Sequence, residues 1–237
     1  MKRILMMVIR NILIVPFAWF KLVYYSKHVD KYTLEEHFKL LKFIDGRAVK
    51  GGNVTVEGYG VENLPKEDGY MFYPNHQGMF DVLAILQVCP ATFGMVFKQE
   101  LANIPFLKQI IACTKSYQLD RDDPRQGLQV IQNVAKDVKG GKNFLIFAEG
   151  TRSKNGNKVG EFKGGSFKAA TKAKCPIVPV ALIDAYKPFD TNTISQATVQ
   201  VHFLEPILYE EYAEMKTNEI AAMVQERIQN TINENLR

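Results

Sequence analysis

The chain has only three cysteines among its 237 residues, and they lie far apart. Cys89, Cys113 and Cys175 form no Cys-x-x-Cys pair and have no histidine beside them. Neither a disulfide framework nor a metal site is therefore predicted. Each cysteine has apolar neighbours, so we expect three buried thiols in a reducing compartment.

Several signatures of other chemistries are also missing. No Gly-x-Ser-x-Gly elbow is present, which argues against a serine hydrolase with an acyl-enzyme step. No Gly-x-Gly-x-x-Gly or Walker loop is present, so no nucleotide cofactor is predicted. The basic stretch 154–174 lacks interleaved aromatic residues and a recognition-helix pattern, and nucleic acid is not expected as a partner.

The N-terminal segment lacks an uncharged apolar run long enough to cross a bilayer. Residues 4–25 are strongly apolar, but Arg10 and Lys21 divide them, whereas a spanning helix needs about 20 apolar residues. The same arginine and the absence of a small-x-small site argue against a cleaved signal peptide. Trp19 and flanking lysines favour a helix that lies in the membrane interface.

Charge supports this interpretation of residues 1–50. They carry ten Lys and Arg against four Asp and Glu, or +6, while the rest of the chain is close to neutral at −1. A second stretch, 34–49, repeats apolar positions at helical spacing. We expect a monotopic two-helix membrane module on the cytoplasmic face of the cell membrane. A helix pair packed on its own core and a single spanning helix remain alternatives.

From residue 51 to 237 the pattern alternates between strands and helices. This predicts one α/β domain with a mixed, mostly parallel sheet flanked by helices. We expect strands at 53–56, 70–73, 92–97, 116–119, 143–147, 177–183 and 197–203. Helices are expected at 82–87, 127–139, 165–173 and 210–235.

The segment Asn75-His76-Gln77-Gly78-Met79-Phe80-Asp81 offers a base and a carboxylate that can orient it. Residues five apart on one straight helix point about 140° apart, so His76 must lie on a turn if Asp81 is to reach it. Asp81 is then expected in the first turn of a following helix. A carboxylate on one ring nitrogen leaves the other free to act as a base. The alternative is a loop histidine that is merely hydrogen-bonded to its neighbour.

A second segment, Glu149-Gly150-Thr151-Arg152, follows the apolar run 144–147, which is typical of a buried strand. Loops at the carboxyl ends of strands are where open α/β sheets build their sites. The segment offers an acid, a tight glycine turn and an arginine whose fork suits a phosphate. Together the two segments favour acyl transfer to a phosphorylated lipid acceptor.

In these segments the chain resembles the glycerolipid acyltransferases, and among them the bacterial 1-acyl-sn-glycerol-3-phosphate acyltransferases. The resemblance extends over four blocks in the expected order, within residues 53–206. The blocks are 75–81, 98–121, 147–152 with 162–165, and 176–180. Two positions depart from the family pattern: Gly78, where a small polar residue is common, and Ala148, where proline is common.

The resemblance implies a role for each matching residue. His76 is expected as the general base and Asp81 as its orienting partner. Lys98 and Arg152 are expected to hold the acceptor phosphate. The other residues implied in acceptor binding are Arg121, Glu149, Gly150, Thr151 and Lys163.

The predicted reaction moves a fatty acyl group from a thioester donor to the 2-hydroxyl of lysophosphatidate, which gives phosphatidate in phospholipid biosynthesis. The donor is expected to be acyl-CoA or an acyl-carrier protein, with no cofactor. Two alternatives remain. In the first, the enzyme acylates a different acceptor, either glycerol 3-phosphate or a lyso-phospholipid. In the second, the protein binds lipid and has no catalytic activity.

Overall fold

A computed structural model describes residues 2–120 and 122–236. Its centre is one seven-stranded sheet with the order β1-β7-β6-β2-β5-β3-β4. The strands are β1 (Val54–Tyr59), β2 (Met71–Pro74), β3 (Gly94–Lys98), β4 (Tyr117–Leu119), β5 (Phe144–Leu145), β6 (Ile177–Ile183) and β7 (Ala197–Phe203). Only the β6–β7 pairing is antiparallel in this described sheet, which confirms the predicted mixed, mostly parallel arrangement.

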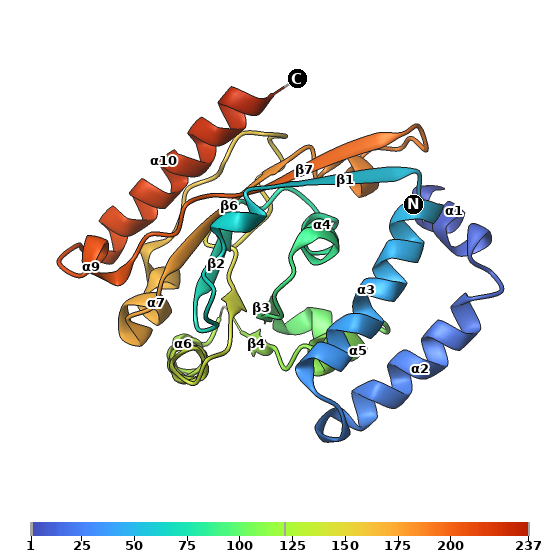
Figure 1. Ribbon diagram of the computed structural model, residues 1–237, viewed down its shortest axis with the longest axis horizontal. Helices are drawn as coiled ribbons and strands as arrows, with labels where there is room; N and C mark the ends of the chain where they lie inside the picture. Colours follow the sequence, from blue (N-terminus) through green and yellow to red (C-terminus); the bar gives the residue numbers. More distant parts are fainter. Residues whose placement is uncertain (1, 121, 237) are drawn as a thin grey trace.

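Helices cover both faces of the sheet (Figure 1). On one face lie α6 (Pro124–Lys139), α7 (Lys168–Ala173) and α10 (Thr217–Asn235), whose apolar residues form one core with the sheet. On the other face lie α3 (Leu34–Gly51) and α4 (Asp81–Val88), which form a second core. β6, with the sequence IVPVALI, is buried along its whole length between these two cores because apolar residues occupy both of its faces.

The N-terminal stretch differs from the prediction in its helix count. Residues 4–25 do not form one helix: α1 (Lys2–Arg10) and α2 (Val15–Lys27) meet at an angle of 97°. The residues between them form a turn, and Pro16 lies in the first turn of α2, where proline is tolerated. With α3, the described part of this segment therefore holds three α-helices.

The same three helices are attached to the rest of the molecule. Arg3 is 2% exposed, and its guanidinium donates to the carbonyls of Gly52 at 2.6 Å, Ser195 at 2.8 Å and Pro188 at 2.9 Å. Leu22 of α2 packs in an apolar cluster with α3 and α5 (Leu107–Cys113). Within the described residues no single helix has the length and apolar content to cross a bilayer, although α1 and α2 taken as a bent pair do.

Several short elements were not predicted. α5 lies inside the second block of the resemblance, and α8 (Lys187–Asp190) follows β6. The predicted strand 143–147 is shortened to β5. The Ile146 N–H still donates to the Phe72 carbonyl at 3.0 Å, and the turn that carries Glu149 begins at Phe147. The predicted helix 210–235 is divided into α9 (Tyr209–Tyr212) and α10. Remaining short 3-10 turns are Val29–Lys31, Val61–Asn63, Gln99–Asn103 and Gly164–Phe167.

Candidate active site

His76 lies on the turn between β2 and α4, and Asp81 is the first residue of α4, as the spacing predicts. His76 Nδ1 is 2.7 Å from Asp81 Oδ2. Asn75 fixes the start of the turn, because its side-chain amide donates to the carbonyl of Leu182 at 3.1 Å and accepts from the Leu182 N–H at 2.7 Å. The turn is thus attached to β6, the central buried strand.

Asp81 is fully buried and holds the turn as well as the imidazole. Its Oδ2 also accepts from the backbone N–H of Gln77 at 2.7 Å, and the N–H of Gly78 lies 3.0 and 3.1 Å from its two oxygens. Burial raises the pKa of Asp81, while the hydrogen bonds from His76, Gly78 and Gln77 oppose this rise. An ionised carboxylate here places the proton on Nδ1 and leaves Nε2 as the free base.

The His76 ring remains accessible on its other side. Its side chain is 23% exposed, and the ring stacks on Phe147 with 4.1 Å between centroids. Phe147 therefore limits the rotation of the imidazole, and Asp81 fixes its direction. In the part of the chain that the structure describes, Nε2 makes no hydrogen bond with the protein.

Gly78 lies very close to the segment that follows β6. A Cβ at this position would run into the carboxylate of Asp190 and come within 3.1 Å of Tyr186 Cα. The turn therefore packs directly against the segment after β6. A side chain at position 78 would require Asp190 to move.

The second segment reaches the same place from the neighbouring strand. β5 pairs with β2 in parallel, so both segments leave the sheet at the carboxyl ends of neighbouring strands. Gly150 has φ of +70°, a conformation that favours glycine, and its N–H closes a tight turn on the carbonyl of Phe147 at 3.0 Å. The N–H of Ser153 then donates to the carbonyl of His76 at 2.9 Å. The structure thus brings the two predicted segments into contact.

Glu149 does not face solvent. It is 4% exposed, and its two oxygens accept from the backbone N–H of His76 at 2.7 Å and of Gly160 at 3.1 Å. Burial raises the pKa of Glu149, and these two hydrogen bonds oppose the rise.

The cationic candidates are accessible. The Arg152 side chain is 40% exposed and lies 3.6 Å from Asp190 Oδ1. Lys98 ends β3, beside β5 in the sheet, and pairs with Glu100 at 2.5 Å. Lys163 Nζ lies beside Gly150, 3.4 Å from where a Cβ would stand. The Thr151 side chain is exposed, and Arg121 lies outside the described residues.

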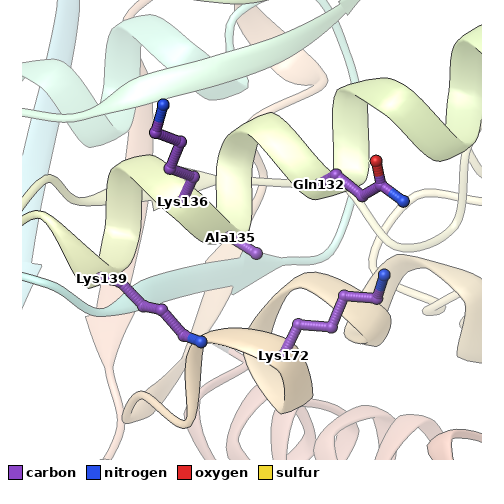
Figure 2. A pocket seen from close by; sticks show the side chains of 5 residues that line it. All are labelled: Gln132, Ala135, Lys136, Lys139 and Lys172. Carbon is purple, nitrogen blue, oxygen red and sulfur yellow. The ribbon is translucent and has the colours of Figure 1, made fainter.

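A hollow of about 440 Å³ lies elsewhere, between α6 and α7. Figure 2 shows Lys136 and Lys139 on one wall and Lys172 on the other, with no predicted site residue among them. α6 leads into β5 and α7 leads toward β6, so this hollow lies toward the amino ends of the strands. The hollow therefore lies away from the carboxyl ends of the strands, where His76 and Asp81 meet.

The profile of the Acyltransferase family matches residues 55–183, which are 129 of the 237 residues. The chain belongs to this family. It is 27% identical to a 1-acyl-sn-glycerol-3-phosphate acyltransferase from Cocos nucifera, over 74% of this chain and 56% of that protein. It is 30% identical to the protein of the same name from Saccharomyces cerevisiae, over 76% of this chain and 61% of that protein.

The chain thus spans less than two thirds of the length of these relatives. It also resembles the crystal structure of the 1-acyl-sn-glycerophosphate acyltransferase PlsC from Thermotoga maritima, with a TM-score of 0.77 and 25% identity. That match covers 98% of this chain and 95% of the other. The predicted family and the α/β fold are both confirmed.

Several residues that build the site were not predicted. Asn75, Gln77, Ser153 and Gly160 act through backbone or amide contacts, and Asp190 pairs with Arg152. Only Asn75 and Gln77 had a signal, since they lie inside the first segment. Within residues 2–120 and 122–236, no three His, Cys, Asp or Glu side chains gather as metal ligands, and the absence of a metal remains a prediction.

Proposed function

We propose that the protein transfers a fatty acyl group from a thioester donor to the 2-hydroxyl of lysophosphatidate, producing phosphatidate for phospholipid biosynthesis. The observation that carries this proposal is the contact between the two segments. An oriented His76–Asp81 pair lies directly against the segment that ends in Arg152. The names of the similar proteins from Cocos nucifera, Saccharomyces cerevisiae and Thermotoga maritima support the same acceptor.

In the proposed reaction His76 Nε2 takes the proton of the acceptor hydroxyl while its oxygen attacks the thioester carbonyl. The carbon–sulfur bond then breaks, and the imidazolium returns its proton to the leaving thiolate. Asp81 stays ionised throughout and stabilises the imidazolium that forms. No covalent enzyme intermediate, metal or cofactor takes part.

The acceptor phosphate is proposed to bind Arg152 and Lys98, with Arg121 and Lys163 as further cations. Arg152 supplies two parallel N–H donors, which suit phosphate better than a point charge does. Its present partner, Asp190, is one-third exposed, so a phosphate can replace that carboxylate. Gly150 and Thr151 lie in the same turn and would contact the acceptor beside Arg152.

Residues 1–50 are proposed as a membrane module beside an acyltransferase domain of residues 51–237. Apolar side chains on α1, α2 and the turn between them are exposed, and three neighbouring basic residues are Arg10, Lys21 and Lys27. The most exposed apolar residues are Leu5, Ile9, Ile12, Leu13, Phe17 and Phe20. Such a surface suits a monotopic position at the cytoplasmic face of the membrane, where the lipid acceptor is found.

The test is a turnover assay with the full chain and labelled acyl donors. Acyl-CoA and acyl-carrier protein are each offered with lysophosphatidate, glycerol 3-phosphate and a lyso-phosphodiester. We expect phosphatidate to form fastest. Faster acylation of another acceptor would change the assigned substrate, and binding without any turnover would identify a lipid-binding protein.

A further inference from the structure

Glu149 occupies an unusual position for a residue implied in acceptor binding. Its carboxylate is buried under the His76 turn, and both oxygens are already used by backbone N–H groups. A phosphate would also be repelled by a carboxylate at contact distance. The geometry therefore separates Glu149 from the exposed cation Arg152, although both lie in one four-residue segment.

The hydrogen bonds of Glu149 act on the backbone of His76. Its Oε1 accepts from the His76 N–H at 2.7 Å, while the Ser153 N–H donates to the His76 carbonyl at 2.9 Å. The segment 149–153 thus holds both polar groups of the His76 backbone. Asp81 can fix the direction of the ring only if the Cα from which the ring projects is itself fixed.

The second oxygen extends this arrangement to another segment. Oε2 accepts from the Gly160 N–H at 3.1 Å, and a Cβ at Gly160 would run into that oxygen. Gly160 has an unstrained backbone, so the need for glycine here comes from the approach of Glu149. The carboxylate therefore fits directly against Gly160, and a substitution at Gly160 can displace it without any change to residue 149.

We propose that Glu149 is a positioning residue that fixes the backbone of His76 against Gly160 and makes no contact with the acceptor. This inference rests on the proposed acyl transfer for its kinetic consequence. It assigns separate tasks within one segment: Glu149 places the base, and Arg152 receives the phosphate.

The experiment compares Glu149→Gln and Gly160→Ala with the control Glu161→Gln, an exposed neighbour. The His76 and Gly160 N–H groups bond to different oxygens of Glu149. Gln has an oxygen at only one of these two positions, so its NH₂ must face the other N–H donor. The alanine methyl displaces the carboxylate while every charge is kept. Both variants should lower kcat about tenfold to a hundredfold, as when a reacting group is misplaced by about 1 Å. The KM for lysophosphatidate should stay unchanged, and Glu161→Gln should match wild type.

An acceptor contact predicts a different pattern. If Glu149→Gln raises the KM for lysophosphatidate and leaves kcat unchanged, Glu149 binds the acceptor and the proposal is wrong. If Gly160→Ala leaves kcat at the wild-type value, the placement of the carboxylate has no effect and the proposal is also wrong. Should Glu149→Gln fail to fold, Gly160→Ala still decides the question, since it keeps every hydrogen-bonding group.

A measurement without substrate separates this inference from the proposed function. The imidazole resonances of His76 are followed by NMR through a pH titration of the folded wild type and both variants. We expect both variants to change the His76 resonances, because each one alters the hydrogen bond that holds the His76 backbone. Unchanged His76 resonances in both variants would overturn the positioning role even if the protein acylated no lysophosphatidate.

Discussion

Replacing Asp81 with asparagine tests the orientation of the base with little change in volume. The carboxylate now accepts from three donors: the His76 ring and the backbone N–H groups of Gln77 and Gly78. An amide has one oxygen and one NH₂ group. If its oxygen faces His76 and Gln77, the NH₂ faces the N–H of Gly78. If the amide is flipped, its NH₂ faces His76 Nδ1 and favours the tautomer in which Nε2 carries the proton.

Both orientations of the asparagine amide should destabilise the folded protein. One buried donor is left facing another donor, which should lower the free energy of unfolding by about 1 to 3 kcal/mol. The kcat should fall by about 10²- to 10⁴-fold, because misorientation of a general base or its tautomer has effects of this size. Acceptor binding should change little, since Asp81 is fully buried.

The assay is acyl transfer at saturating lysophosphatidate, together with urea unfolding of the same samples. Asp122→Asn, at an exposed loop position, is the control for the chemical change. Asp81→Asn should be no more harmful than His76→Ala. Wild-type turnover in Asp81→Asn, with the protein folded, would show that Asp81 does not orient a catalytic base.

Three further predictions follow from other parts of the structure. Arg152→Ala should raise the KM for lysophosphatidate about tenfold or more, and Arg152→Lys should restore only part, because a point charge cannot replace the fork. The KM for an unphosphorylated acceptor should be insensitive to the same substitutions. Equal effects on phosphorylated and unphosphorylated acceptors would show that Arg152 has a structural role. Burial raises the pKa of Asp45 to about 8, and its oxygens have no hydrogen-bond partner within the described residues. The folded state therefore binds the proton more tightly than the unfolded state, and stability should fall by up to about 5 kcal/mol as pH rises from about 4 to 8. Asp45→Asn should remove this fall in urea unfolding, whereas Asp30→Asn, with an exposed side chain, should not. Finally, residues 1–50 should bind anionic vesicles better than neutral ones, by about 1 kcal/mol per basic residue near the surface, and less well in high salt. Salt-independent binding to both vesicle types, or full binding after deletion of residues 1–50, would refute the interfacial position.

The sequence predicted the strands and the His76 turn because both depend on local signals. All seven predicted strands are present, although β5 is only two residues long. The turn before α4 followed from the angular spacing of His76 and Asp81, given that the two side chains meet. Apolar periodicity also predicted α3, α6 and α10, whose buried faces repeat at helical spacing.

What the sequence did not show depends on contacts between distant segments. The His76 N–H and Glu149 are 73 residues apart, and no local pattern states that they bond. α8, which presents Asp190 to Arg152, has four residues and no detectable period. The bend between α1 and α2 was missed because both helices are apolar, and composition alone does not locate a turn.

In the proposed mechanism His76 acts as the base in acyl transfer to lysophosphatidate. The most direct test measures initial rates of labelled phosphatidate formation by full-length wild type and His76→Ala, with folding checked by circular dichroism. We expect kcat to fall by about a hundredfold or more, with the KM for lysophosphatidate unchanged, because only the proton transfer is lost. Near-normal turnover by folded His76→Ala would contradict this mechanism.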